Sequence, residues 1–242
     1  LQRLTRSARA MGFAEIPAPE AIRREIARTL EANGMRDGVH IRLTLSRGVK
    51  ITSGMDPRLN RSGPTLIVLA EHKAPVYSKQ GLKLMTSTMR RPSPDVLDPK
   101  IHHANLLNSI LAKIQANAAG ANDAIMLDSR GFIAETNATH LFLVQGGLLR
   151  TTTLAACPEG ITRATVLRLC REHGIDHQVG DLSLAELYRA DEAFCTGTMG
   201  ELAGVTQVDG RRIGSGEIGP MTQRLSALYA KRTAAGGTRV VD

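Results

Sequence analysis

The spacing of apolar residues changes near residue 120, and this change restricts the fold more than any other feature of the chain. Before it, apolar residues keep helical spacing and predict an amphipathic helix that begins near His103. They are Leu106, Leu107, Ile110, Leu111 and Ile114. After it, four short apolar runs predict an antiparallel meander, at 123–128, 132–136, 140–145 and 148–151. A helix followed by such strands indicates an α+β fold with two or more layers.

Further helices and strands are expected on both sides of this region. The expected helices span 18–34 and 162–173 and open at Ser183 and Pro220. The expected strands span 40–46, 65–70, 82–88, 191–196 and 205–208. Ser183 and Glu186 have the spacing of a capping box. The run TLIVLA at 65–70 is apolar with little alternation, so we expect it to be more fully buried than the alternating strand at 40–46.

Residues 90–99 contain three prolines, which remove backbone donors and disfavour helix in the residues before them. We therefore expect a linker at 93–99 between a small α/β domain at 1–92 and a larger α+β domain at 100–242. The N-terminus lacks the apolar centre of a signal peptide, and it also lacks an initial Met. We expect the printed sequence to begin inside a longer chain, so that the first domain is incomplete.

Composition narrows the classes of function. The net charge is +8 over 242 residues, but the basic residues are dispersed and there is no Trp, so we do not expect nucleic-acid binding. No apolar run is long enough to predict a membrane span. Neither the histidines nor the cysteines have the spacing of a metal site. The three cysteines are widely spaced, which favours small buried thiols in a reducing cytoplasm.

Two segments have the composition of anion-binding loops. In PEGITRATVLRL at 158–169, a glycine precedes a helix start, where free amides and the Thr162 hydroxyl suit a phosphate or carboxylate. The alternative is that Thr162 simply caps its own helix. In CTGTMGE at 195–201, glycines and threonines follow an apolar strand and permit close backbone approach to an anion. A plain tight turn would have the same composition.

A third segment, GFIAETNATHLFLV at 131–144, places Glu135 at the end of a strand. An acid at such a position can point into a site, and the alternative is a solvated residue of a hairpin.

Taken in order, these segments resemble the class IV aminotransferases, which use pyridoxal phosphate and include branched-chain and D-amino-acid aminotransferases and aminodeoxychorismate lyase. The resemblance covers essentially the whole chain. It is strongest in the order of NLLNSILAKIQAN, DAIMLDSRGFIAET, PEGITR, LYRADEAFCTGTMGE and VDGRRIGSG. It implies the two-domain fold of that family and, because its members are commonly homodimers, a homodimer.

The resemblance also implies roles for individual residues. Glu135 matches the acid that pairs with the ring nitrogen of pyridoxal phosphate. His140 stands where the family more often has asparagine, and we expect it to make a structural polar contact. The remaining matches are to binding positions: Ile161, Thr162 and Thr198 for the cofactor phosphate, and the backbone at Met199 and Gly200 for the substrate carboxylate.

The chain departs from the family where the catalytic lysine is expected. Family members carry a lysine three or four residues before the asparagine that corresponds to Asn105, and this chain has His102 and Ile101 there. A covalent bond to the cofactor needs a primary amine, which imidazole lacks. Three explanations stay open: covalent attachment is lost, with His102 or His103 as a proton carrier; the backbone brings Lys100 into the site; or a cofactor-bearing lysine of the natural chain is absent from the printed sequence.

The resemblance therefore implies transfer of an amino group between an amino acid, branched-chain-like or D, and a 2-oxo acid. Two alternatives remain at this point. One is a lyase of the aminodeoxychorismate type, which uses the same cofactor, and the other is a family member without catalytic activity. The catalytic candidates are His102 and, less favoured, Lys100.

Overall fold

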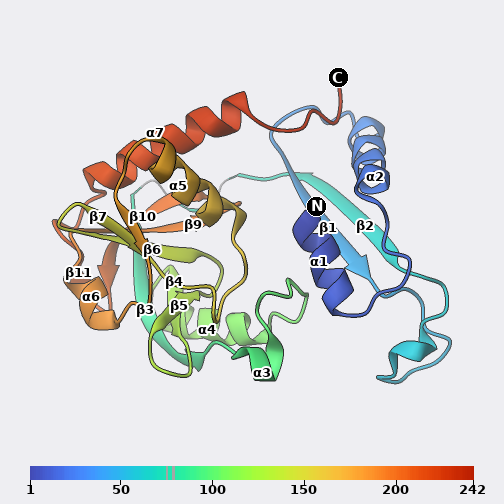
Figure 1. Ribbon diagram of the computed structural model, residues 1–242, viewed down its shortest axis with the longest axis horizontal. Coiled ribbons are helices and arrows are strands. Elements are labelled where there is room, and N and C mark those ends of the chain that lie inside the picture. The colour runs from blue at the N-terminus through green and yellow to red at the C-terminus, as the bar shows by residue number, and fades with distance from the viewer. Residues whose placement is uncertain (75, 78–79) are drawn as a thin grey trace. The chain divides into compact units, whose positions relative to one another are not determined.

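The computed structural model describes residues 1–74, 76–77 and 80–242 (Figure 1). The chain packs as two compact units. The first unit is Leu1–Ala74 with Gly237–Asp242, and the second is Pro75–Gly236. This division by packing falls before the linker expected at 93–99, because the strand β3 (Leu82–Arg90) is hydrogen-bonded within the sheet of the second unit. The assignment of folding domains to 1–92 and 100–242 stays a prediction.

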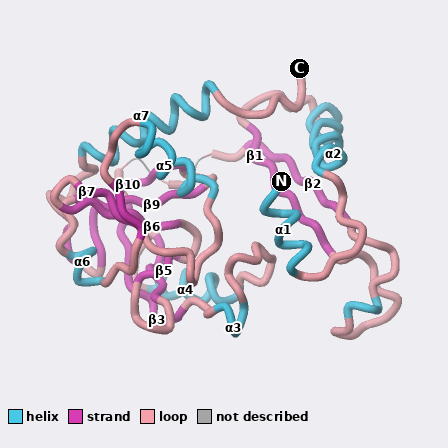
Figure 2. Tube along the Cα trace, in the orientation of Figure 1, coloured by secondary structure: helices cyan, strands magenta, loops and turns pink. Residues whose placement is uncertain are grey.

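The first unit packs helices against a two-stranded antiparallel sheet. Its elements are α1 (Gln2–Ala10), α2 (Pro19–Ala32), β1 (Val39–Ser46), the 3-10 helix η1 (Pro57–Leu59) and β2 (Thr65–His72). The predicted helix at 18–34 is confirmed: Ile22, Ile26 and Leu30 lie one turn apart and are buried, and Gly34 closes the helix at φ +62°. Near the C-terminus, Val240 and Val241 pack against this same core. Figure 2 shows the chain ending close to α2, in the same unit.

The prediction that 65–70 is a more fully buried strand is wrong. Strand β2 alternates, and the outward Ile67 and Leu69 are 52% and 50% exposed. The reason is that the sheet of the first unit has only two strands and only one of its faces packs on the core of α2. The alternate residues Leu66 and Val68 face that core.

The second unit contains the remaining elements. After β3 they are α3 (Pro94–Leu97), α4 (Leu107–Ala118), β4 (Asp123–Leu127), β5 (Ile133–Thr136), β6 (His140–Gln145), β7 (Leu148–Thr151), α5 (Ile161–Glu172), β8 (His177–Val179), α6 (Leu184–Tyr188), β9 (Glu192–Gly197), β10 (Glu201–Val208), β11 (Arg211–Arg212) and α7 (Pro220–Ala235). The capping box of Ser183 and Glu186 is confirmed at the start of α6. The helices expected near 162 and at Pro220 are confirmed as α5 and α7.

The strands of the second unit form one sheet in the order β5-β4-β3-β10-β9-β6-β7-β8, with β11 paired to β10. The predicted meander is therefore wrong at one point, because β5 and β6 are consecutive in the chain but are not hydrogen-bonded neighbours. Two long-range parallel pairings cause the separation: β3 lies between β4 and β10 and runs parallel to both. Strand β6 pairs instead with β9, so that residues near 140 lie beside residues near 196.

Helices cover this sheet in two places. Helices α5 and α7 lie side by side (Figure 1) and pack over the stacked rings of Phe142 and Phe194, whose centroids are 4.9 Å apart. Helix α4 packs elsewhere, against β3 and β4. A further cluster of buried apolar residues, including Leu84, Ile125 and Leu141, completes the core. Both layers required by an α+β fold are therefore present.

Helix α4 begins later and faces differently than its sequence predicts. It starts at Leu107 rather than near His103, and residues 102–106 have no regular structure. Its core face consists of small residues, Ala112 and Ala116, which let the helix approach the sheet closely. The larger apolar residues of the predicted stripe point outward and are at least 38% exposed: Leu106, Leu107, Ile110, Leu111 and Ile114.

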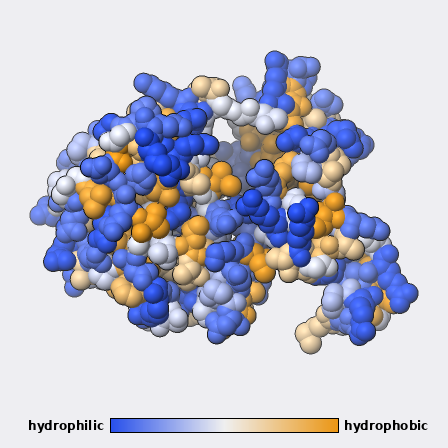
Figure 3. Space-filling view, viewed as in Figure 1, coloured by the Kyte–Doolittle hydropathy of each residue, from blue (hydrophilic) through white to orange (hydrophobic). Residues whose placement is uncertain are grey.

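The face of the molecule seen in Figure 3 is mostly hydrophilic, with apolar side chains exposed in small groups. Within the part of the chain that the structure describes, no helix has the length and apolar character needed to cross a bilayer. The same residues include no group of three or more His, Cys, Asp or Glu side chains placed to hold a metal ion.

Candidate active site

Glu135 is a buried acid in the middle of a polar cluster. It lies on β5, is 5% exposed, and forms an ion pair with Arg91, whose Nη2 is 2.9 Å from Oε1. His140 lies on the other side of the carboxylate, with Nε2 4.0 Å from Oε2. The alternative in which Glu135 is a solvated hairpin residue is therefore wrong. A buried carboxylate is costly unless a cation or hydrogen bonds compensate it, and its position in a polar cluster makes Glu135 a candidate site residue.

Burial raises the pKa of Glu135 to about 8, and the charge of Arg91 opposes that rise. The carboxyl group therefore exchanges a proton close to neutral pH. A group of this kind can accept or share a proton with a second polar group that enters the same space.

Arg91 is the residue that connects this cluster to its surroundings, and it is absent from the site residues expected from the sequence. Its Nε donates to the carbonyl of Ala156 over 3.3 Å, and its Nη1 donates to Asn108 and Ser109 on the first turn of α4. One guanidinium thus joins Glu135, the loop before α5 and the start of α4. The sequence signal that could have indicated Arg91 is the pair of arginines at the end of β3, Arg90 and Arg91, which the sequence pattern assigns only to the proline-rich segment.

His140 connects Glu135 to the loop that opens α5. Its Nε2 lies 2.8 Å from the carbonyl of Pro158, and since a carbonyl only accepts, Nε2 carries the proton. The loop passes so close to the imidazole that a Cβ on Gly160 would meet Cε1 of His140 at 2.5 Å. Only glycine fits there without a shift. The expected role of His140 as a structural polar contact agrees with these bonds, and it now has a stated partner.

The N-terminus of α5 presents free backbone amides next to this loop. Gly160 is the N-cap residue and supplies no side-chain cap, so the amides at Ile161 and Thr162 keep the electropositive character of a helix start. Thr162 is buried, and its hydroxyl lies 3.5 Å from that of Tyr229. The alternative in which Thr162 merely caps its own helix is therefore wrong.

In the second predicted anion-binding segment, at 195–201, Thr198–Gly200 form the turn between β9 and β10. The turn follows strand β9, which is paired with β6. In that pairing Thr196 on β9 lies opposite His140 on β6. Gly197 is tight against the neighbouring Thr139, where an added Cβ would lie 3.1 Å from Cγ2. The sheet order thus brings the start of β6, with His140, next to the strand that ends in this turn.

The residues at the expected lysine position lie in an irregular segment before α4. Lys100 and His102 are exposed there, and the backbone amide of Lys100 donates to Asp98. His103 is half-buried, and its Nδ1 has no hydrogen-bond partner. Lys113, the next lysine along the chain, lies 3.3 Å from Asp123 through its Nζ. None of the ion pairs of the described residues joins a lysine to Glu135.

Buried polar atoms without partners occur near this cluster. The Oγ1 of Thr196 is unpaired although the residue is only 1% exposed, and Nε of the buried Arg163 is also unpaired. Such atoms normally have a partner, so a small polar ligand would satisfy them. A buried acid, an uncapped helix start and an unpaired hydroxyl together fit a phosphorylated heterocycle at both of its ends. The absence of lysine at position 102 does not fit its covalent attachment.

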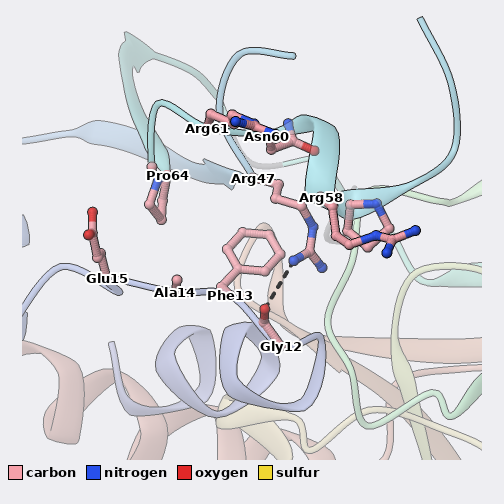
Figure 4. Close-up of a pocket in the computed structure, with 11 residues that line it drawn as sticks. Gly12, Phe13, Ala14, Glu15, Arg47, Arg58, Asn60, Arg61 and Pro64 are labelled. Carbon is pink, nitrogen blue, oxygen red and sulfur yellow. Dashed lines mark hydrogen bonds between the residues drawn. The ribbon is translucent and has the colours of Figure 1, made fainter. Parts of the chain in front are cut away.

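A separate cavity of about 360 Å³ lies in the first unit (Figure 4). Two of its arginines have partners: Arg47 donates to the carbonyl of Gly12 over 3.0 Å and stacks on Phe13, and Arg58 pairs with Asp56. These contacts hold the cavity wall together, so we do not assign the chemistry to it.

Comparison with known proteins identifies the family. The model of the family described as Amino-transferase class IV matches residues 1–208. The chain belongs to the class IV aminotransferases. Across 241 residues it is 52% identical to the branched-chain-amino-acid aminotransferase-like protein 2 of Arabidopsis thaliana, covering 99% of this chain and 43% of that protein. The chain thus spans less than half the length of this curated relative.

Two further relatives match over more of their length. The putative branched-chain-amino-acid aminotransferase of Methanocaldococcus jannaschii is 38% identical over 218 residues, which is 90% of this chain and 75% of that protein. The crystal structure of a T.th. branched-chain amino acid aminotransferase with pyridoxamine 5'-phosphate superposes with a TM-score of 0.89 and 33% identity, covering 95% of this chain and 76% of that one. The α+β class IV fold expected from the sequence is confirmed.

Proposed function

We propose that this chain is a pyridoxal-phosphate-dependent aminotransferase that moves an amino group between a branched-chain amino acid and a 2-oxo acid. Family membership supports the reaction class, and the relatives named as branched-chain aminotransferases support the substrate class. A structural relative described with pyridoxamine 5'-phosphate supports the cofactor. The same relatives do not favour the lyase alternative. D-amino acids remain the second substrate class to test.

The observation that carries this proposal is the buried Glu135 between Arg91 and His140, linked through Pro158 to the start of α5. A carboxyl group in that position suits the ring nitrogen of the cofactor. The amides at Ile161 and Thr162 suit the phosphate, and Thr198 would add a hydroxyl. The backbone at Met199 and Gly200 would receive the substrate carboxylate.

Pyridoxal phosphate, when bound, supplies an electron sink for the negative charge that develops on the amino acid when its α-proton leaves. The protein's share is to orient this ring and to hold a proton at its nitrogen. Glu135 would do so as a carboxylate that accepts a hydrogen bond from the protonated nitrogen, and Arg91, with Nη2 2.9 Å from Oε1, favours this charged form against the desolvation that raises the pKa. His102 would carry the α-proton as an imidazole base, with Lys100 as the less favoured alternative.

One observation supports a second candidate, a family member that binds the cofactor without turning over amino acids. The position expected to hold lysine is His102, and Lys100 is exposed. Imidazole can move a proton, but it cannot replace the covalent anchor of a lysine. The two candidates share the binding site and differ only in turnover.

We also propose a homodimer in a reducing cytoplasm. The outward apolar residues of α4, from Leu107 to Ile114, support an interface, because exposed apolar stripes of this kind are usually covered. The three cysteines are free thiols buried in the core, which supports a reducing compartment.

Mixing the purified protein with pyridoxal phosphate and then with L-leucine or D-alanine tests this proposal. An aminotransferase forms pyridoxamine phosphate and the 2-oxo acid in a single half-reaction. A chain that binds the cofactor but yields neither product with any amino acid supports the non-catalytic candidate. Failure to bind the cofactor at all contradicts both.

A further inference from the structure

Two residues at the start of the second unit contact the turn between β9 and β10. The backbone amide of Val76 donates to the carbonyl of Met199 over 3.1 Å. The ring of Tyr77 lies against Gly200, so closely that a Cβ at Gly200 would meet Cδ2 at 2.3 Å. Neither residue belongs to the turn. Val76 contacts Met199 and Tyr77 contacts Gly200, which are two of the three residues of the turn.

Tyr77 is itself anchored in the sheet. Its hydroxyl donates to Oδ2 of Asp123 over 2.7 Å, and Asp123 is 3% exposed at the start of β4. The other carboxylate oxygen of Asp123 accepts from Asn137 and lies 3.3 Å from the ammonium of Lys113. Burial and the neighbouring charge of Asp123 raise the pKa of Tyr77, so its hydroxyl remains a donor. The phenol ring is thus fixed at both ends, by Gly200 and by Asp123.

The turn needs such support because the backbone is strained where the turn joins β10. Glu201 directly follows it and has φ +52°, a left-handed conformation that is unfavourable for a residue with a side chain. Gly200 closes the turn by donating to the carbonyl of Gly197 over 3.4 Å, which is a long hydrogen bond. A turn that precedes a strained residue and is closed only by a long hydrogen bond keeps its conformation only if contacts with other residues restrain it. The contacts with Val76 and Tyr77 supply that restraint.

We propose that Tyr77 is a positioning residue, which sets the backbone of Met199 and Gly200 in the conformation that receives a carboxylate. The proposal rests on the proposed function for its ligand, a 2-oxo acid. Tyr77 acts through the turn and does not touch the reacting atoms. Removing its ring lets the turn relax, whereas removing only its hydroxyl frees the ring from Asp123 but leaves the packing on Gly200.

Three variants and one control test this inference. Tyr77→Ala removes the ring, Tyr77→Phe removes only the hydroxyl, and Gly200→Ala introduces the predicted clash. Tyr188→Phe is the matched control, because Tyr188 donates to Asp209 over the same distance of 2.7 Å in the same unit, away from the turn. Each phenylalanine variant loses one hydrogen bond of 2.7 Å to a carboxylate, so a general effect of losing such a bond would appear in both.

The first readout is binding of 2-oxo-4-methylpentanoate and of pyridoxal phosphate, each measured by calorimetry. We expect Tyr77→Ala to weaken binding of the 2-oxo acid by at least about tenfold, since small displacements of a binding group are costly. Tyr77→Phe should weaken it by about threefold, the loss of one ordinary hydrogen bond. Pyridoxal phosphate should be affected less, because α5 also holds its phosphate. Equal loss of both ligands would indicate a merely structural role and overturn the proposal.

The second readout is hydrogen–deuterium exchange at residues 195–203, which needs no ligand. The inference predicts faster exchange in Tyr77→Ala than in the wild type and no change in Tyr188→Phe. Unchanged exchange in Tyr77→Ala overturns it, even if Gly200→Ala does not fold. Faster exchange combined with no 2-oxo acid binding by the wild type would instead leave Tyr77 as the anchor of the turn and contradict the proposed function.

Discussion

Arg91 and Glu135 form an ion pair inside the second unit, with Nη2 2.9 Å from Oε1 and side chains only 12% and 7% exposed. Arg91 also donates to the loop before α5 and to the first turn of α4. A single guanidinium therefore links the proposed ring-nitrogen acid to two other parts of the site.

Replacing Arg91 by methionine should destabilise the protein strongly. Above the Glu135 pKa of about 8 the change leaves an ionised carboxylate buried without its cation, and at such a pH the loss of one partner of a buried pair costs about 3 kcal/mol. Urea unfolding monitored by circular dichroism measures this loss. Arg90→Met is the control, because Arg90 is exposed and its side chain donates to the carbonyl of Ser87 rather than to an acid. Equal stability of the two variants would show that the pair has no structural importance.

Stability should fall as pH rises from about 5 to about 8, and Glu135 should cause part of that fall. Burial raises its pKa from 4.5 to about 8, so between these values the folded protein holds a proton that the unfolded chain has lost. Stability from this group is present below the unfolded pKa and is lost as pH approaches the folded pKa. In Glu135→Gln the free energy of unfolding should fall less steeply with pH, because the glutamine side chain does not titrate. An unchanged pH profile in the variant would mean that Glu135 is ionised throughout.

Gly160→Ala should disturb the start of α5 through His140. Its added Cβ would meet the imidazole at 2.5 Å, and overpacking of this kind costs about 1–3 kcal/mol. The backbone is not the cause, because Gly160 has an ordinary φ of −70°. Gly180→Ala is a suitable control, since nothing lies within 4 Å of its added Cβ. Adding His140→Ala to Gly160→Ala should recover part of the loss in a double-mutant cycle; purely additive losses would exclude the steric cause.

Ile110→Glu should convert a dimer into a monomer. Ile110 is 52% exposed in the middle of the apolar stripe of α4, and a buried charge at an interface is unfavourable. Sedimentation equilibrium of wild type and variant measures the change in mass. Val179→Glu, at an exposed apolar position on β8, should leave the mass of the particle unchanged. A monomeric wild type would contradict the proposed homodimer.

Borohydride reduction followed by intact-mass measurement should show no fixed cofactor on the wild-type chain and one fixed cofactor on His102→Lys. The reason is that only a primary amine forms the reducible bond, and position 102 holds imidazole. Fixation on the wild type that disappears in Lys100→Gln would show that Lys100 reaches the site. A wild-type mass larger than the printed sequence by one lysine would show instead that the natural chain carries that residue.

Much of the local structure could be predicted from sequence because its causes are local. Ile22, Ile26 and Leu30 recur at helical spacing, and Ser183 and Glu186 satisfy the helix start between them, so α2 and α6 follow directly. Glu135 and the segment at Ile161 are recognisable from their order along the chain.

The errors came from contacts between distant residues. Parallel pairing of β3 with β10 joins residues more than a hundred positions apart, and no local pattern encodes which strands become neighbours. The apolar stripe of α4 predicts the wrong core face, because the small residues Ala112 and Ala116 are what the sheet contacts. Arg91 was missed for the same reason, because its partner Glu135 is 44 positions away in the printed numbering.

Titration of the purified protein with pyridoxal phosphate, followed by absorbance of the bound chromophore, tests cofactor binding by the second unit most directly. We expect a saturable spectral change in the wild type and an affinity lower by about tenfold in Glu135→Ala, which loses a charge-assisted hydrogen bond to the ring nitrogen. A wild-type spectrum that remains the sum of free protein and free cofactor at every concentration would contradict the assignment of this site.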